Sequence, residues 1–300
     1  MSTTDKILKR VINASMENCR MGRTCIGKQI RKYETTNCHA IVLFYHEASK
    51  VDIEQHLLYL KNEFKLVSLS EMVRRSKQNS IDDKEELIAI TFDDGHADNY
   101  YALYPLCKKY GIPITIFQTS YNIGEPIWTA ELKANNINTE LYKTYNSKEL
   151  KKYIQSLRAE KKYDPVEKVR RRLLSKEEIK KMSMCDMIEF EGHTHTHIDL
   201  RSLSISEARK EIEINIEVIK ELTGQRPNHF CYPFGGYNSA IKSLVKKLGF
   251  SSASTVLPGT IGNNTDPYEI RRLNAQFDLK DVITKIRLYQ IKSDIIKNFS

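Results

Sequence analysis

The chain has 300 residues, of which 40% are hydrophobic, and a formal net charge of +9. These values are enough for the core of one large domain, and they exclude a chain that is disordered throughout. No apolar run approaches the length that spans a bilayer, and residues 1–6 lack the apolar centre of a secretory signal, so we expect a cytoplasmic protein. The six cysteines are scattered without a Cys-x-x-Cys pair, which predicts reduced thiols.

Two segments carry much of the positive charge. Residues 1–33 contain eight lysines and arginines against two acids, and residues 151–181 contain twelve against five. Each segment is either a solvated helical face or a surface for an anionic partner such as nucleic acid, anionic lipid or a phosphate-bearing carrier. No recognised nucleic-acid-binding module accompanies the charge, so we expect no nucleic-acid partner. Apolar residues at helical spacing over 7–12 predict a short helix, either packed on the domain or lying on a membrane surface.

The first core elements follow residues 1–38, which form a basic N-terminal extension. Residues 40–45 are apolar and β-favouring, and they predict a buried strand with His46 directly after it. His46 either lines a site at the strand end or is a hydrogen-bonded structural histidine. The next predicted elements are a helix over 52–64, a strand over 64–67, and a helix over 70–75 with Ser70 as its cap.

The most informative strand is the apolar run Leu87 to Phe92, which ends in Asp93, Asp94 and Gly95. A buried parallel strand here delivers two adjacent carboxylates to its carboxyl end, where α/β folds place their active sites. Gly95 then permits a sharp turn. Adjacent carboxylates repel each other unless a cation or a proton relieves the conflict. The alternative is a solvated turn, because Asp-Asp-Gly is favourable turn sequence.

Helices and strands alternate beyond this point, and one long segment interrupts them. A predicted helix over 99–110 and a predicted strand over 113–117 indicate right-handed crossovers and a parallel sheet. Residues 122–175 break the alternation and contain the only tryptophan, Trp128. An insertion of this length beside a barrel mouth is either a lid or substrate clamp, or a structural decoration.

A second polar motif runs from His193 to His197 and contains three alternating histidines. A predicted strand over 187–190 presents it. The motif is either a polar loop with at most one core histidine or a metal site. Imidazole nitrogens together with a carboxylate oxygen suit a zinc-like divalent ion, and a catalytic site keeps one position open for water.

The rest of the chain continues the alternation. Ser204 and Glu207 form a capping box for a helix that ends at Gly224. No G-x-G-x-x-G or Walker motif occurs, so the pattern supports an α/β barrel or sheet without a nucleotide-binding signature. The other predicted elements are a helix opened by Ser175, a strand over 229–232, a helix over 239–248, strands over 253–256 and 269–273, and a terminal helix over 279–300.

Five segments, in order along residues 39–278, resemble the polysaccharide deacetylase family, that is the NodB-homology domain or carbohydrate esterase family 4. Two of them are Thr91-Phe92-Asp93-Asp94-Gly95 and His193-Thr194-x-x-His197. The other three are Phe44-Tyr45-His46, the segment Phe230 to Gly235, which is similar to the family's Tyr-Pro-aromatic-Gly segment, and a closing section from Gly249 to Leu273.

The resemblance implies a distorted, incomplete (β/α) barrel of about seven parallel strands with a helical insertion. It also implies metal-dependent hydrolysis of an acetyl group on a sugar, and we expect an N-acetyl group. Asp94, His193 and His197 would hold one divalent ion, for which we expect Zn²⁺, and Asp93 would take the proton of the attacking water. The backbone amide of Phe234 would be the oxyanion donor.

The expected substrate follows from the predicted location. A cytoplasmic enzyme of this family would act on an acetylated saccharide in the biosynthesis of cell-surface polysaccharide or glycolipid. The saccharide is either free or linked to a carrier whose phosphate meets the basic segments, which would bring the enzyme to the membrane surface. We expect Tyr232 to contact the substrate, and Trp128 either stacks on a sugar ring or packs within the protein.

Two departures from the family's commonest pattern concern the chemistry. Cys231 stands near the place of an arginine in the Pro-aromatic segment, and no histidine follows His229 to supply the usual late general acid. The acid then comes from elsewhere, or metal and water act alone. Arg271 or Arg272 either orients Asp93 or forms a surface salt bridge.

The alternative function is a catalytically inactive saccharide-binding protein on the same fold. The complete set of two aspartates and two histidines argues against it, because an inactive site need not keep all four.

Overall fold

The computed structural model describes residues 40–297, apart from 83–84, 135–136, 140–151, 155, 158–171 and 264. The basic extension over residues 1–38 and much of the 122–175 insertion, including Arg170 and Arg171, lie outside the described residues.

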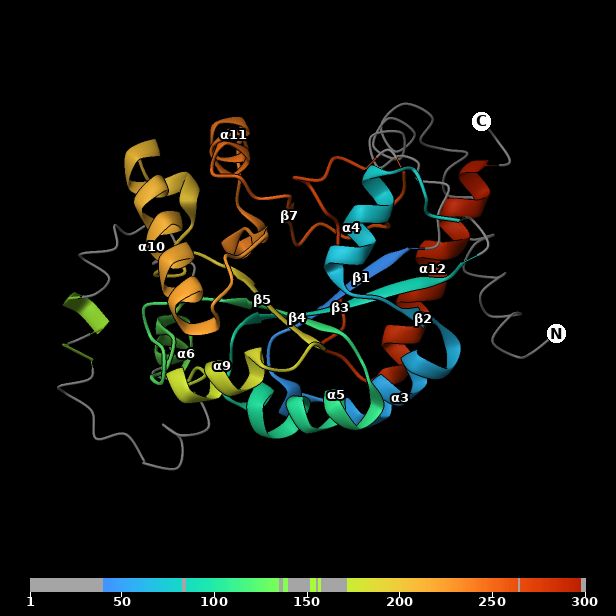
Figure 1. Ribbon diagram of the computed structural model, residues 1–300, viewed down its shortest axis with the longest axis horizontal. Helices are drawn as coiled ribbons and strands as arrows, with labels where there is room; N and C mark the ends of the chain where they lie inside the picture. The colour runs from blue at the N-terminus through green and yellow to red at the C-terminus, as the bar shows by residue number, and fades with distance from the viewer. Residues whose placement is uncertain are drawn as a thin grey trace.

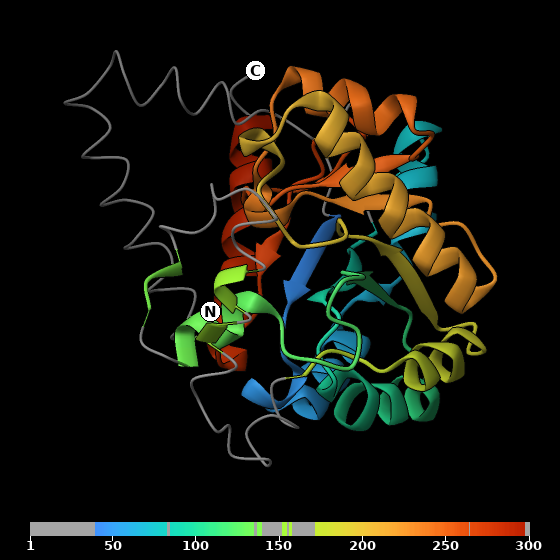
Figure 2. The same ribbon diagram turned by 90° about the vertical axis from the view of Figure 1, so that its left-hand side faces the viewer.

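A curled sheet forms the centre of the molecule, with helices along its outer side (Figures 1 and 2). Its strands run in the order β7-β6-β5-β4-β3-β1-β8, with β2 paired to β3 off this path, and every pairing between the named strands is parallel. The path ends at β7 and β8 without closing, so it forms a half-barrel, which confirms the expected distorted, incomplete (β/α) barrel. The strands are β1 (Ile41–Tyr45), β2 (Lys65–Leu66), β3 (Leu87–Asp94), β4 (Ile114–Gln118), β5 (Ile188–Gly192), β6 (His229–Cys231), β7 (Ser252–Ser254) and β8 (Leu273–Asn274).

The helices follow the predicted order, with local corrections at their ends. Ser175 and Ser204 form the expected capping boxes. Ser68, not Ser70, caps α4, because the backbone amide of Glu71 donates to its hydroxyl. The named helices are α3 (Ile53–Glu63), α4 (Leu69–Lys77), α5 (Tyr104–Tyr110), preceded by a π-helical turn (Asn99–Leu103), α6 (Trp128–Ala134), α9 (Lys176–Ser183), α10 (Ile205–Thr223), α11 (Ser239–Lys247) and α12 (Leu279–Lys297).

The strand predicted over 269–273 is the largest error in the element boundaries. Most of it is irregular, and β8 begins only at Leu273. The preceding residues cross the open seam of the half-barrel: Ile270 bridges Ser254, the last residue of β7, and the amide of Arg272 donates to the carbonyl of Leu257. This part of the chain therefore links the two ends of the sheet instead of extending it.

Both faces of β3 are buried, as expected for a central parallel strand. Ile88, Ile90 and Phe92 pack with residues of the outer helices α3, α5, α9 and α12. Leu87 and Ala89 point to the other face, where a second apolar cluster fills the inside of the curl. In the described part of the chain, no helix combines the length and the apolar character that crossing a bilayer would require.

Candidate active site

The candidate active site lies at the carboxyl edge of the curled sheet. Asp93 and Asp94 are the last two residues of β3, and His193 directly follows β5. Cys231 ends β6, and His46 directly follows β1. Because parallel strands end at the same edge, residues that are far apart in the sequence come together here.

A left-handed backbone at Asp94 turns its carboxylate toward the histidines. Strict alternation along β3 would direct Asp94 to the same face as Phe92, away from Asp93. The φ of Asp94 is 70°, which breaks the alternation. Oδ1 of Asp94 consequently lies 3.4 Å from Nε2 of His193 and 3.1 Å from Nε2 of His197.

These three side chains are a fitting set of ligands for a divalent cation. They are buried, and their potential ligand atoms lie within 4.8 Å of one another. Nδ1 of His193 donates to the carbonyl of Cys231 at 2.8 Å, so Nε2 is the ring nitrogen that faces Asp94. No described residue donates a hydrogen bond to the buried Oδ1 of Asp94. A buried anionic oxygen without a hydrogen-bond donor is unfavourable unless a cation compensates its charge, and two nitrogens with one oxygen suit zinc.

His96 lies against the other oxygen of Asp94, with 3.4 Å between Nε2 and Oδ2. Burial alone would lower the pKa of His96, but the hydrogen bond to Asp94 and its charge raise it overall. Burial would likewise raise the pKa of Asp94, yet the neighbouring histidines, His197 foremost, hold it well below its usual range. In the sequence, the only signal that His96 contacts Asp94 is its place directly after the Asp-Asp-Gly turn.

The second carboxylate, Asp93, is held by Arg272. Nη1 of Arg272 donates to Oδ1 at 2.7 Å and Nη2 donates to Oδ2 at 2.8 Å. Arg272 is fully buried, so this pair is not the surface salt bridge that the sequence left open. Burial alone would raise the pKa of Asp93, but Arg272 outweighs it and the pKa is lowered. Asp93 is therefore an ionised carboxylate at neutral pH.

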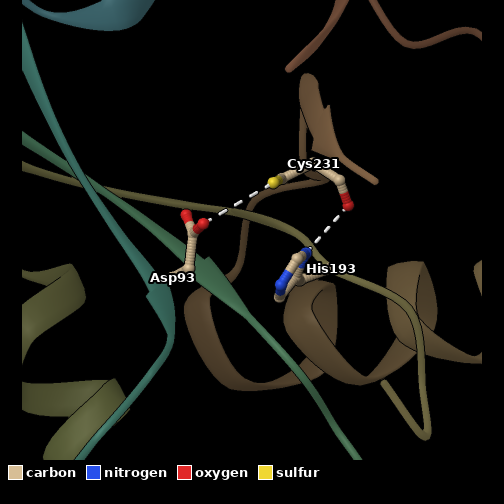
Figure 3. Close-up of side chains that lie close together, drawn as sticks. All are labelled: Asp93, His193 and Cys231. Carbon is tan, nitrogen blue, oxygen red and sulfur yellow. Dashed lines mark hydrogen bonds between the residues drawn. The ribbon is translucent and has the colours of Figure 1, made fainter. Parts of the chain in front are cut away.

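Cys231 lies between these two arrangements (Figure 3). Its carbonyl accepts from His193, while its Sγ lies 3.0 Å from Nη2 of Arg272 and 3.9 Å from Oδ2 of Asp93. Asp93, His193 and Cys231 thus form a second group with three potential ligand atoms. The guanidinium of Arg272 already neutralises Asp93 and contacts the sulfur, so a cation there would meet like charge. The group around Asp94 is the better candidate.

Backbone strain is concentrated at this site. Five described residues other than glycine have a positive φ, and four of them are here. Each of these conformations costs roughly 1–3 kcal/mol and persists only because surrounding contacts hold the residue in place. Trp128 supplies such contacts, because its Nε1 donates to the carbonyls of Thr196 at 3.1 Å and His197 at 3.3 Å. The four strained residues are Asp94, Thr194, His197 and Phe234.

The aromatic residues expected to contact substrate lie inside the protein. Trp128 is 4% exposed and packs with Phe234, and Tyr232 is 0% exposed and donates its hydroxyl hydrogen to the carbonyl of Tyr268. Trp128 therefore follows the packing alternative, and the burial of Tyr232 speaks against its expected contact with substrate. Phe234 itself sits in a short turn (Pro233–Gly235), and its ring packs 4.7 Å from the ring of His197. The backbone of this turn is therefore next to the candidate ligands.

Two further histidines flank the site. His46 is partly exposed, and Gln276 fixes its backbone by accepting from the amides of His46 and Glu47. Burial lowers the pKa of His46, and the nearby Asp94 partly opposes this effect. His195 is also partly exposed and is absent from the groups of potential ligands among the described residues.

Comparison with known proteins identifies the class. Residues 80–253 match the polysaccharide deacetylase family model, and the chain belongs to this family.

The relatives add detail to this assignment. The chain is 24% identical over 244 residues to YxkH, a candidate polysaccharide deacetylase of Bacillus subtilis (strain 168), with 77% of this chain and 70% of the relative covered. It is 23% identical to the poly-beta-1,6-N-acetyl-D-glucosamine N-deacetylase of Staphylococcus aureus (strain MSSA476), with 76% and 67% covered.

Solved structures share the fold. The deacetylase PplD of Streptococcus pyogenes, solved with acetate, has a TM-score of 0.59 at 19% identity and covers 82% of this chain and 97% of its own. IcaB of Ammonifex degensii has a TM-score of 0.59 at 18% identity, with 83% and 96% covered.

Proposed function

We propose that the protein is a metal-dependent hydrolase that removes an acetyl group from a sugar, with an N-acetyl group as the expected target. The observation that carries this proposal is the pair of carboxylates at the end of β3, which differ in their surroundings. Asp94 faces two imidazoles with a buried oxygen that no described residue satisfies, and Asp93 is ionised by a buried arginine. Asp94 therefore suits a cation, and Asp93 is an ionised carboxylate that can accept a proton from water.

Asp94, His193 and His197 would hold the ion, and Zn²⁺ fits this donor set. When bound, a divalent ion would lower the pKa of a water molecule and polarise the acetyl carbonyl. His193 is oriented for this task by its hydrogen bond to Cys231, and Asp94 by His96.

Asp93 would be the general base. Its ion pair with Arg272 keeps it deprotonated, and the bidentate geometry fixes the direction of its carboxylate. It lies next to Asp94 in the chain, but the ion pair keeps it out of the ligand set. The backbone amide of Phe234 would donate to the oxyanion, because the turn that carries it packs against His197.

His46 would be the general acid that the sequence did not supply at the usual place. It follows β1, the neighbour of β3, and lies close enough to Asp94 and Asp93 for their charges to act on its pKa. Burial lowers that pKa, so the protonated imidazole would be a stronger acid toward the leaving amine but would be populated chiefly below neutral pH.

The substrate class is taken from the relatives. The Staphylococcus aureus protein is an N-deacetylase of poly-β-1,6-N-acetyl-D-glucosamine, and we propose a polymer or oligomer of an N-acetylated hexosamine for this chain. A cytoplasmic location, a carrier-linked substrate and membrane contact stay predictions. Arg172 belongs to the basic segment 151–181, which was expected to meet a carrier phosphate. It forms an ion pair with Glu178, which makes it less available to a phosphate.

The test measures acetate release from acetylated glucosamine oligomers by three samples. They are metal-loaded wild type, wild type treated with a chelator, and the metal-loaded Asp93→Asn variant. We expect release only from the metal-loaded wild type. Saccharide binding without acetate release at any metal would instead support the inactive saccharide-binding alternative.

A further inference from the structure

We propose that Tyr121 is a sugar-binding platform beside the reaction centre, which holds a neighbouring unit of an oligosaccharide. This proposal rests on the proposed function and names a specificity-determining residue for it. The two aromatic residues expected for this task, Trp128 and Tyr232, are buried.

The ring of Tyr121 is 41% exposed. Single exposed aromatic residues are common on protein surfaces, so exposure alone carries no conclusion. The position of Tyr121 relative to the candidate ligands supplies the second observation.

The loop that carries Tyr121 starts next to Asp94. Gln118 at the end of β4 pairs in register with Asp94, and both the amide and the hydroxyl of Thr119 lie 3.4 Å from the carbonyl oxygen of Asp94. Tyr121 comes two residues later, so it stands beside the reaction centre.

The same loop is joined to the histidine motif from the other side. The amides of Tyr121 and Ser120 donate to the carbonyl of His195 at 2.8 and 3.3 Å. The hydroxyl of Ser120 also lies 2.9 Å from Nδ1 of His195. His195 sits between the two candidate ligands His193 and His197 in the chain, so these bonds fix the position of the Tyr121 loop relative to the candidate ligands.

The ring geometry suits a carbohydrate. The rings of Tyr121 and His195 meet at 79° with their centroids 5.4 Å apart, so the tyrosine ring packs edge to face with the histidine motif. A pyranose has apolar faces of C–H groups and a rim of hydroxyls, so it pairs with an amphipathic ring such as tyrosine and with polar groups around it. Since Tyr121 borders the centre without contributing to it, the bound unit would be a neighbour of the acetylated one.

The experiment compares Tyr121→Ala and Tyr121→Phe with wild type on two substrates, a pentamer of β-1,6-linked N-acetylglucosamine and a small aryl acetate ester. For Tyr121→Ala, we expect the ratio of kcat/KM for the pentamer to kcat/KM for the ester to fall about five-fold, mainly through KM. Tyr121→Phe keeps the ring and should stay within about two-fold of wild type. Ile214→Ala, which removes an equally exposed apolar side chain from α10, should leave both activities unchanged.

Pentamer binding by calorimetry, with Zn²⁺ present, separates the two proposals. If wild type releases no acetate but binds the pentamer, and Tyr121→Ala binds it about five-fold more weakly, the platform stands and the hydrolase proposal fails. If Tyr121→Ala is active and its ratio of kcat/KM for the pentamer to kcat/KM for the ester is unchanged, the platform proposal is overturned. An unchanged pentamer affinity of Tyr121→Ala also overturns it, whether or not the wild type releases acetate. Equal losses on pentamer and ester would also overturn it, because they would indicate a disturbed centre.

Discussion

Arg272 and Asp93 form a bidentate ion pair with both partners buried, which ties the segment that crosses the open seam of the half-barrel to the end of β3. The arginine comes from the segment that joins the two ends of the sheet, and its Nε also donates to the carbonyl of Thr255 beside β7. Cys231 stands near the place of an arginine in the family's commonest pattern, and its sulfur contacts the guanidinium of Arg272. A small residue on β6 thus accommodates an arginine that arrives from the opposite end of the sheet.

Replacing Arg272 by Gln should disturb both stability and pH dependence. An uncompensated buried carboxylate costs about 3–5 kcal/mol in the free energy of unfolding. Asp93 has a lowered pKa in the native state, so the pair contributes stability above the unfolded pKa and loses it as pH falls. Without Arg272 the pKa of Asp93 should rise, and the acid limb of the pH–rate profile should move to higher pH.

Urea unfolding and kcat/KM as a function of pH check this prediction. The matched control is Arg271→Gln, since Arg271 is only partly buried and packs along Gly259. Equal effects of the two substitutions would contradict a specific role for Arg272.

Substitution of a candidate ligand and substitution of the candidate base should have different effects on metal content. His197→Ala should lose the ion, whereas Asp93→Asn should keep about one ion per chain and lose roughly 10²–10⁴-fold in kcat. The measurements are metal content after dialysis and acetate release. Loss of metal and activity together in Asp93→Asn would mean that the roles of the two aspartates are reversed.

His46→Gln should reduce kcat while the metal content stays the same. A general acid contributes roughly 10²–10⁴-fold, and its loss should remove the alkaline limb of the pH–rate profile. An ester with a good leaving group needs little protonation, so its hydrolysis should fall less than that of the amide. Equal losses on both substrates would indicate a structural role for His46.

Trp128→Phe should weaken metal binding by roughly 10–100-fold, because it removes the hydrogen bonds from Nε1 to the strained histidine loop. At saturating metal, the KM for the oligosaccharide should stay close to the wild-type value, because the ring is buried. Metal titrations and KM at high Zn²⁺ test the two statements. A raised KM with normal metal affinity would restore Trp128 as a sugar contact.

Because the folded protein disfavours protonated His229, the free energy of unfolding should fall as the pH is lowered. Burial, with a contribution from Lys77, lowers the pKa of His229 from 6.5 to about 3. Its stability contribution is therefore complete above pH 6.5 and is lost as pH falls from 6.5 toward 3, by at most about 1.4 kcal/mol per pH unit. Urea midpoints between pH 7 and pH 5 should fall less in His229→Gln than in wild type. Parallel curves would contradict a buried neutral histidine.

The sequence by itself determined the features that depend on local pattern. The apolar run from Leu87 to Phe92 defined a buried strand and placed two aspartates at its end, because the period of hydrophobic residues and the turn glycine are local. Capping boxes at Ser175 and Ser204 marked helix starts for the same reason. The order of strands and helices was enough to predict a parallel, barrel-like sheet, and the motifs at the strand ends were enough to identify the family.

Only the tertiary structure decided which residues support the chemistry. Arg272 and Asp93 are separated by 179 residues, and nothing local distinguishes Arg272 from Arg271. The left-handed turn at Asp94 overrides strand alternation, and only the surrounding contacts hold it. Trp128 and Tyr121 both follow β4 where the sequence shows no periodic apolar pattern, yet Trp128 is buried and Tyr121 is exposed. Burial and ion pairing arise from contacts between distant segments, and a local sequence pattern carries no record of those contacts.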